Sequence, residues 1–134
     1  FIARHGLTMF QMNPHFPVNT VQIMRGAVVA EMDGVLLKYA DAVFHHMWEE
    51  PKKMDDAEVI RAALGQSAID AGRMLARIQD QDLKDALLKN TEASVSRGAF
   101  GSPTFFVGGE MFFGKDRLRE VEEEIVRLKQ RGTR

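Results

Sequence analysis

Two short motifs near the end of the chain, Ser102-Pro103 and Gly114-Lys115-Asp116, combine residue types that could bind a small charged peptide. Ser102-Pro103 directly precedes an apolar run, so a cis bond there would leave the backbone groups of Ser102 unpaired and facing outward. Such groups can pair with an extended peptide as an added strand does. The alternative is an ordinary trans proline, which the residues alone favour because only about 5–6% of such bonds are cis.

The second motif precedes the last predicted helix. The first N–H groups of a helix and its positive dipole end can bind a carboxylate, and the Asp116 side chain could accept an ammonium group. Together they would recognise both charges of an amino-acid head group. The alternative is that Asp116 simply caps the helix, and the residues alone favour this simpler role.

The composition of the chain argues against several other kinds of functional site. The chain has no cysteine, which excludes disulfides, thiolate metal ligands and cysteine nucleophiles within it. Its net charge is −1 with acids and bases interspersed, unlike a nucleic-acid-binding protein. No apolar run approaches the ~18 residues of a membrane span. Adjacent histidines such as His45 and His46 diverge on a helix and chelate one metal poorly. We therefore expect no nucleic-acid or membrane partner and no bound metal.

The elements that must position these motifs begin with a helical region. Helices are predicted from Asn19 or Thr20, after Asp33-Gly34, over 56–65, from Ser67, and from Asp80 or Asp82 to Gly98. Asp55 and Glu58 have capping-box spacing for the third of these, and Ser67 and Asp70 have the same spacing for the fourth. Apolar residues recur at helical spacing, which predicts buried stripes. In the first two helices the predicted stripe residues are Val21, Met24, Val28, Leu37, Ala40, Phe44 and Met47.

A hairpin and a closing helix follow. The β-favouring runs TFFV (104–107) and EMFF (110–113) are separated by Gly108-Gly109, which predicts a two-residue type I′ turn. Both faces of these strands are largely apolar, so we expect cover on both sides. Asp116 then starts a helix predicted to bury Leu118, Val121, Ile125 and Leu128.

Several motifs make the chain similar to the 2-hydroxychromene-2-carboxylate isomerase family, close kin of kappa-class glutathione transferases among DsbA-like thioredoxin folds. They are HFPVNT (15–20), KNTEASVSRGAFG (89–101), GAFGSPTFFVGGEMFFGKDRL (98–118) and a single tryptophan, Trp48, late in the second predicted helix. The resemblance runs over nearly the whole chain. It implies an α/β, thioredoxin-like fold with an all-helical insertion.

The resemblance also implies a domain organisation. Residues 1–17 would be the end of the crossover helix and a loop, residues 18–97 the helical insertion, and residues 98–134 the closing β-β-α half. The family's opening β-α-β part has no counterpart here. The chain opens on FIARHGL, which resembles the last turn of a helix with Gly6 as its left-handed cap. We therefore expect the sequence to begin inside a larger fold.

The resemblance implies that glutathione is the cofactor. Pro103 matches the family's cis-proline, and Ser102 matches the residue whose backbone pairs with the cysteinyl part of glutathione. Lys115 and Asp116 match the clamp on the γ-glutamyl head group. The family's thiolate-stabilising serine lies in the part without a counterpart, so the catalytic residue is unknown here. Phe113 stands where the family often has tryptophan, which leaves the shape of the aromatic-substrate pocket open.

The implied function is a glutathione-dependent isomerase acting on aromatic-degradation intermediates in the cytoplasm. We expect a homodimer, or cover from a missing N-terminal segment, and no activity from this chain alone. Two alternatives stay open: a kappa-class-like glutathione transferase, and a non-catalytic thioredoxin-like or DsbA-like module that binds a peptide or a protein.

Overall fold

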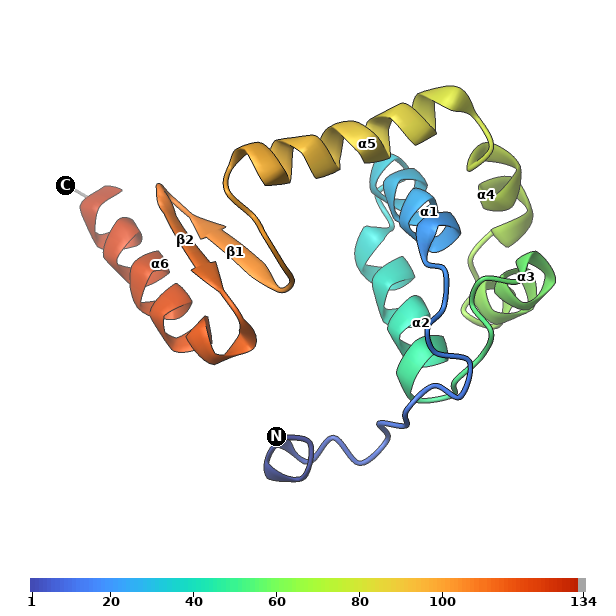
Figure 1. The fold of residues 1–134 in the computed structure, drawn as a ribbon, viewed down its shortest axis with the longest axis horizontal. Coiled ribbons are helices and arrows are strands. Elements are labelled where there is room, and N and C mark those ends of the chain that lie inside the picture. The colour runs from blue at the N-terminus through green and yellow to red at the C-terminus, as the bar shows by residue number, and fades with distance from the viewer. Residues whose placement is uncertain (133–134) are drawn as a thin grey trace. The chain divides into compact units, whose positions relative to one another are not determined.

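A computed structural model describes residues 1–132, so the last two positions of the predicted closing segment, 133–134, lie outside it. The chain divides into two compact units, Phe1–Leu88 and Lys89–Arg134. Helix α5 (Gln81–Ser96) begins in the first unit and ends in the second (Figure 1). None of the helices formed by residues 1–132 is long and apolar enough to cross a membrane.

The first unit is built from helices. A short 3₁₀ turn, η1 (Ala3–His5), ends at Gly6, whose φ of 63° confirms the predicted left-handed cap. An extended segment then leads to the helices α1 (Val21–Met32), α2 (Leu36–Trp48), α3 (Ala57–Gln66) and α4 (Ala71–Arg77). Helices α1 and α2 lie side by side, and α1 also packs on α4 (Figure 1).

One apolar core holds these helices together. Its largest fully buried apolar side chains come from α3, α5 and the connecting segments: Met54, Ile60, Leu64, Ile78 and Leu83. Between α1 and α2, the Tyr39 hydroxyl donates a hydrogen bond of 2.6 Å to the backbone oxygen of Ile23. Burial raises the pKa of this hydroxyl, which therefore stays a neutral donor.

The stripes predicted for the first two helices are largely wrong. Val21, Met24, Leu37 and Phe44 are exposed, although Val28 and Met47 are buried as predicted. In α2, the polar aromatic side chains of Tyr39 and His46 enter the core, which a simple apolar periodicity does not anticipate. The buried residues of the two helices are Ile23, Gly26, Val28, Val29, Ala30, Tyr39, Ala42, His46 and Met47.

Aspartates cap the helices α3 and α4, but not at the residues predicted as caps. Asp56, not Asp55, caps α3, and its carboxylate accepts hydrogen bonds from the backbone N–H groups of Glu58 and Val59. Asp70, not Ser67, caps α4 and accepts from the N–H of Arg73, so the capping box predicted from Ser67 and Asp70 is wrong by three residues. The Asp55–Glu58 capping box is therefore wrong by one residue, because Asp56 is the last residue with extended backbone.

The second unit contains an antiparallel hairpin of β1 (Thr104–Val107) and β2 (Glu110–Phe113). Val107 pairs with Glu110, which confirms the two-residue Gly108-Gly109 loop. The type I′ prediction is wrong because that turn needs positive φ at both loop residues, and only Gly108 of the two has it, at 60°.

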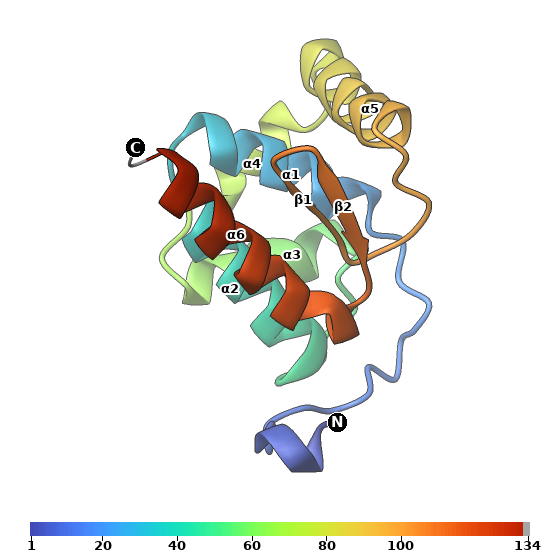
Figure 2. The ribbon, with the colours of Figure 1, turned by 90° about the vertical axis from the view of Figure 1, so that its left-hand side faces the viewer.

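After the hairpin, a 3₁₀ turn η2 (Lys115–Arg117) leads into α6 (Leu118–Gly132), which packs against the hairpin (Figures 1 and 2). Within the described part of this unit, β1 is half-buried and β2 is mostly exposed, so the expected cover on both faces is not present. One helix covers one face of a two-stranded sheet. Of the four residues predicted as the buried stripe of α6, only Val121 is fully buried.

Candidate functional site

The Ser102–Pro103 bond is cis, as the family resemblance implies and contrary to the trans alternative. It forms an elbow before β1 in which Ser102 and Pro103 are exposed. The Thr104 hydroxyl donates to the backbone oxygen of Gly101 at 2.6 Å and so spans the elbow. Among residues 1–132, no group hydrogen-bonds the backbone N–H or C=O of Ser102. The elbow therefore presents an unused backbone donor and acceptor to a ligand.

One hydrogen bond joins this elbow to the start of the closing helix. The N–H of Gly114 donates to the backbone oxygen of Pro103 at 2.9 Å, extending the strand register beyond the Thr104–Phe113 pair. Ser102 precedes the acceptor residue, and Lys115 follows the donor residue. Since consecutive Cα atoms are about 3.8 Å apart, the two motifs lie beside each other. The structure thus brings together the two groups of residues that the sequence analysis selected.

Asp116 is the second residue of η2 and carries a solvent-accessible charge. Its carboxylate pairs with the ammonium group of Lys115, and its side chain is 81% exposed. The helix-cap interpretation of Asp116 is wrong, because Gly114 takes the cap position with a φ of 97°. An exposed acid with a lysine beside it can exchange that lysine for the ammonium group of a ligand.

Aromatic rings border the elbow. Phe113 is 44% exposed, Phe100 is 73% exposed, and their ring centroids lie 4.6 Å apart. Gly101 packs so closely on Phe113 that a Cβ there would lie 2.7 Å from its Cε2 atom. The sequence analysis selected Phe113 but missed Phe100. Its place two residues before Ser102 was the available signal.

The site therefore offers binding groups of three kinds. They are an unpaired backbone donor and acceptor at Ser102, a carboxylate–ammonium pair at Lys115 and Asp116, and two exposed aromatic rings. This set suits a ligand that combines a peptide backbone, a free amino-acid head group and an adjacent apolar body.

The histidines of α2 form a separate cluster in the first unit. His45, His46 and Glu50 offer ligand atoms that lie within 4.8 Å of one another. However, the Lys52 Nζ lies 2.7 Å from the His46 Nδ1, which places a positive charge where a cation would bind. Burial, followed by the charge of Lys52, lowers the pKa of His46. The arrangement fits a neutral buried imidazole accepting a hydrogen bond better than a metal ligand.

Two known proteins resemble the chain, one in its sequence and one in its structure. A 2-hydroxychromene-2-carboxylate isomerase from Pseudomonas putida is 45% identical over 40 residues, which are 30% of this chain and 20% of that protein. A solved structure of a selenomethionine-labelled 2-hydroxychromene-2-carboxylate isomerase superposes with a TM-score of 0.78 at 23% identity. That match covers 96% of this chain and 63% of the other. The chain thus spans less than two thirds of the length of each.

The family comparison covers most of the chain. The model of the DSBA-like thioredoxin domain matches residues 1–126. This match, together with the structural superposition, confirms the fold class predicted from the sequence. The chain belongs to the DSBA-like thioredoxin domain family.

Proposed function

We propose that this chain forms the glutathione-binding part of an isomerase of the 2-hydroxychromene-2-carboxylate isomerase type, acting on aromatic-degradation intermediates. The observation that carries the proposal is the hydrogen bond from Gly114 to Pro103, which sets the exposed Ser102 backbone beside Lys115 and Asp116. The similarity to two proteins named as this isomerase supports the reaction type.

The residues present fit glutathione in two places. The backbone N–H and C=O of Ser102 would pair with the cysteinyl residue of the tripeptide, as an added strand pairs with a sheet edge. The Asp116 carboxylate would accept the γ-glutamyl ammonium group in place of Lys115. The γ-glutamyl carboxylate would then lie near the N–H groups at the helix start and near the Lys115 ammonium group.

When bound, glutathione supplies a thiolate that can add to a conjugated substrate and leave again after ring opening and rotation. The chain's own residues orient it: the Ser102 backbone fixes the cysteinyl residue and Asp116 fixes the opposite end. Phe100 and Phe113 provide an apolar surface for an aromatic substrate beside the elbow. No residue of this chain is assigned to activate the thiol.

Titration calorimetry with glutathione tests the proposal. We expect Asp116→Ala to weaken binding by about tenfold to a hundredfold, since a hydrogen bond to a charged group contributes about 1.5–3 kcal/mol. Glu123→Ala is the matched control, because Glu123 is an exposed acid of the same unit that pairs with Arg119, and we expect no change. Equal binding by the wild type and Asp116→Ala, or no binding by the wild type, would contradict the proposal.

A peptide-binding module is the second candidate, favoured by the same unpaired Ser102 backbone. The Lys115–Asp116 pair argues for glutathione, because an internal peptide segment has no free head group to clamp. The dipeptide Cys-Gly separates the two functions in the same titration. It should bind much more weakly than glutathione if the clamp is used, and equally well if only the elbow is used.

A further inference from the structure

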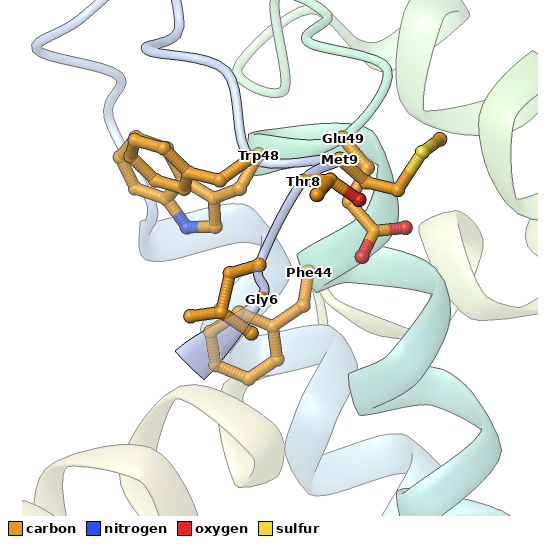
Figure 3. A pocket seen from close by; sticks show the side chains of 8 residues that line it. Gly6, Thr8, Met9, Phe44, Trp48 and Glu49 are labelled. Carbon is orange, nitrogen blue, oxygen red and sulfur yellow. The ribbon is translucent and has the colours of Figure 1, made fainter. Parts of the chain in front are cut away.

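The first unit contains a pocket of about 360 Å³ between the N-terminal segment and the end of α2. Its apolar walls are Leu7, Met9, Phe10, Phe44 and Trp48. The Phe10 and Trp48 rings are stacked, with centroids 5.9 Å apart and an interplanar angle of 20°. Figure 3 shows the Trp48 and Phe44 rings and the Glu49 carboxylate around the same space. The pocket is therefore shaped for a flat apolar body.

Hydrogen bonds fix the chain directly after the N-terminal wall of this pocket. The N–H of Gln11 donates to the backbone oxygen of Trp48 at 2.6 Å, and its side-chain amide donates to that of Glu49 at 2.7 Å. The buried Asn13 amide donates to the backbone oxygens of Met47 and Lys52 at 3.2 and 3.0 Å. These bonds fasten the N-terminal segment to the end of α2, which keeps Phe10 beside Trp48.

The charge of the pocket comes from one residue. Glu49 is the only charged residue among those that line it in the described chain. Its Oε2 atom accepts a hydrogen bond of 2.8 Å from the His45 Nδ1, which orients the carboxylate. The ammonium group of Lys52, three residues further along the chain, contacts His46 and Glu50 instead. The pocket thus combines aromatic faces with a negative charge.

We propose that this pocket binds an aromatic cation, a flat ring that carries an ammonium or comparable positive group. Aromatic faces attract cations through their quadrupole, and tryptophan does so most strongly. The Glu49 carboxylate adds a direct charge interaction. The site does not depend on the proposed isomerase function, since the substrate named for the relatives is itself a carboxylate and Glu49 would repel it.

Intrinsic fluorescence can report on this pocket directly, because Trp48 is the only tryptophan of the chain. Three probes share a benzyl or phenyl ring and differ in charge: benzyltrimethylammonium, benzyl alcohol and benzoate. We expect a saturable fluorescence change with the cation, at about tenfold tighter binding than with the alcohol, which is a difference of about 1.4 kcal/mol. Benzoate should bind more weakly than the alcohol.

Two carboxamide variants separate the role of Glu49 from general charge effects. Glu49→Gln should lower the preference for the cation over the alcohol to about twofold to fivefold, which is what cation–π attraction at an exposed site provides. Glu50→Gln is the matched control, since this neighbouring acid does not line the pocket, and it should keep the wild-type order of probes. Far-UV circular dichroism checks that both variants fold.

The order of the three probes on the unaltered chain decides the proposal even if a variant fails to fold. Binding of benzoate or benzyl alcohol as tightly as the cation would overturn it. A cation that leaves Trp48 fluorescence unchanged would also overturn it, as would an equal loss of preference in the Glu49→Gln and Glu50→Gln variants.

Discussion

Replacing Gly26 by alanine should destabilise the helical unit, because the space for a side chain is occupied by the core. A Cβ at Gly26 would overlap the Tyr39 hydroxyl and lie 3.0 Å from Tyr39 Cζ and 3.2 Å from Met74 Sδ. Tyr39 is 2% exposed, and its hydroxyl is fixed to the backbone oxygen of Ile23. Tyr39 cannot move away without losing that bond and disturbing α2.

The magnitude follows from three contributions. Overpacking of a filled core costs about 1–3 kcal/mol, and loss of the tyrosine hydrogen bond costs about 0.5–1.5 kcal/mol. The higher helix propensity of alanine offsets about 1 kcal/mol of this loss of stability. We therefore expect Gly26→Ala to lower the free energy of unfolding by about 0.5–3.5 kcal/mol.

Urea unfolding followed by far-UV circular dichroism measures this change. Gly65→Ala is the matched control, because Gly65 also lies within a helix but has open space where its Cβ would lie. It should be neutral or stabilising by up to about 1 kcal/mol. Equal stability of the two variants would refute the packing account.

A second substitution tests which atom causes the conflict. Tyr39→Phe removes the hydroxyl that a Cβ at Gly26 would overlap. Alone it should destabilise the chain by about 1 kcal/mol, and in the Gly26→Ala background it should cost less or even stabilise. If the effects of the two substitutions on the free energy of unfolding simply add, the Tyr39 hydroxyl is not the cause of the destabilisation in Gly26→Ala.

Two further predictions concern pH and the hairpin loop. Burial, Lys52 and His45 lower the pKa of His46 below 6.5, so the folded state binds fewer protons than the unfolded state. Stability should be full above about pH 6.5 and fall as the pH drops towards the lowered value, and His46→Gln should flatten this dependence in urea titrations between pH 5 and 8. Gly108→Ala should lower the melting temperature, since Gly108 has a φ of 60° and its Cβ would lie 2.9 Å from Leu128 Cδ1. Gly109→Ala, with open space at its Cβ, should change the melting temperature much less, and equal shifts would contradict this account of the loop.

The existence and order of the elements could be predicted from local signals. Aspartates mark the starts of α3 and α4, glycines mark the ends of η1 and the hairpin loop, and apolar β-favouring runs mark the strands. These signals act through backbone hydrogen bonds within a few residues, so they are visible in a single sequence. The cap of α3 was misplaced by one residue and that of α4 by three, which shows the precision that such signals reach.

The buried faces of α1 and α2 could not be predicted in the same way. They depend on Tyr39 and His46, whose polar atoms find partners on Ile23 and Lys52. These partners lie on other elements, so the pattern of one helix does not show them. The aromatic pocket was missed for a similar reason, because Phe10 and Trp48 meet only through the docking of the N-terminal segment on α2.

The candidate site was predicted in part. The residues alone selected Ser102-Pro103 and Gly114-Lys115-Asp116, but they favoured a trans bond and a capping role for Asp116. The cis bond followed from the family resemblance, and the hydrogen bond that joins the two motifs required the strand register. The two motifs of the candidate site could therefore be selected from the sequence. Their positions relative to one another could be seen only in the structure.

An NMR titration of the ¹⁵N-labelled chain with glutathione tests most directly whether the elbow and the helix start bind one ligand. The account predicts that the amide signals of Ser102, Lys115 and Asp116 shift together along one saturation curve, and that Asp116→Ala removes these shifts. Signals that shift only outside residues 98–118, or a Ser102 amide that stays unchanged at saturating glutathione, would contradict it.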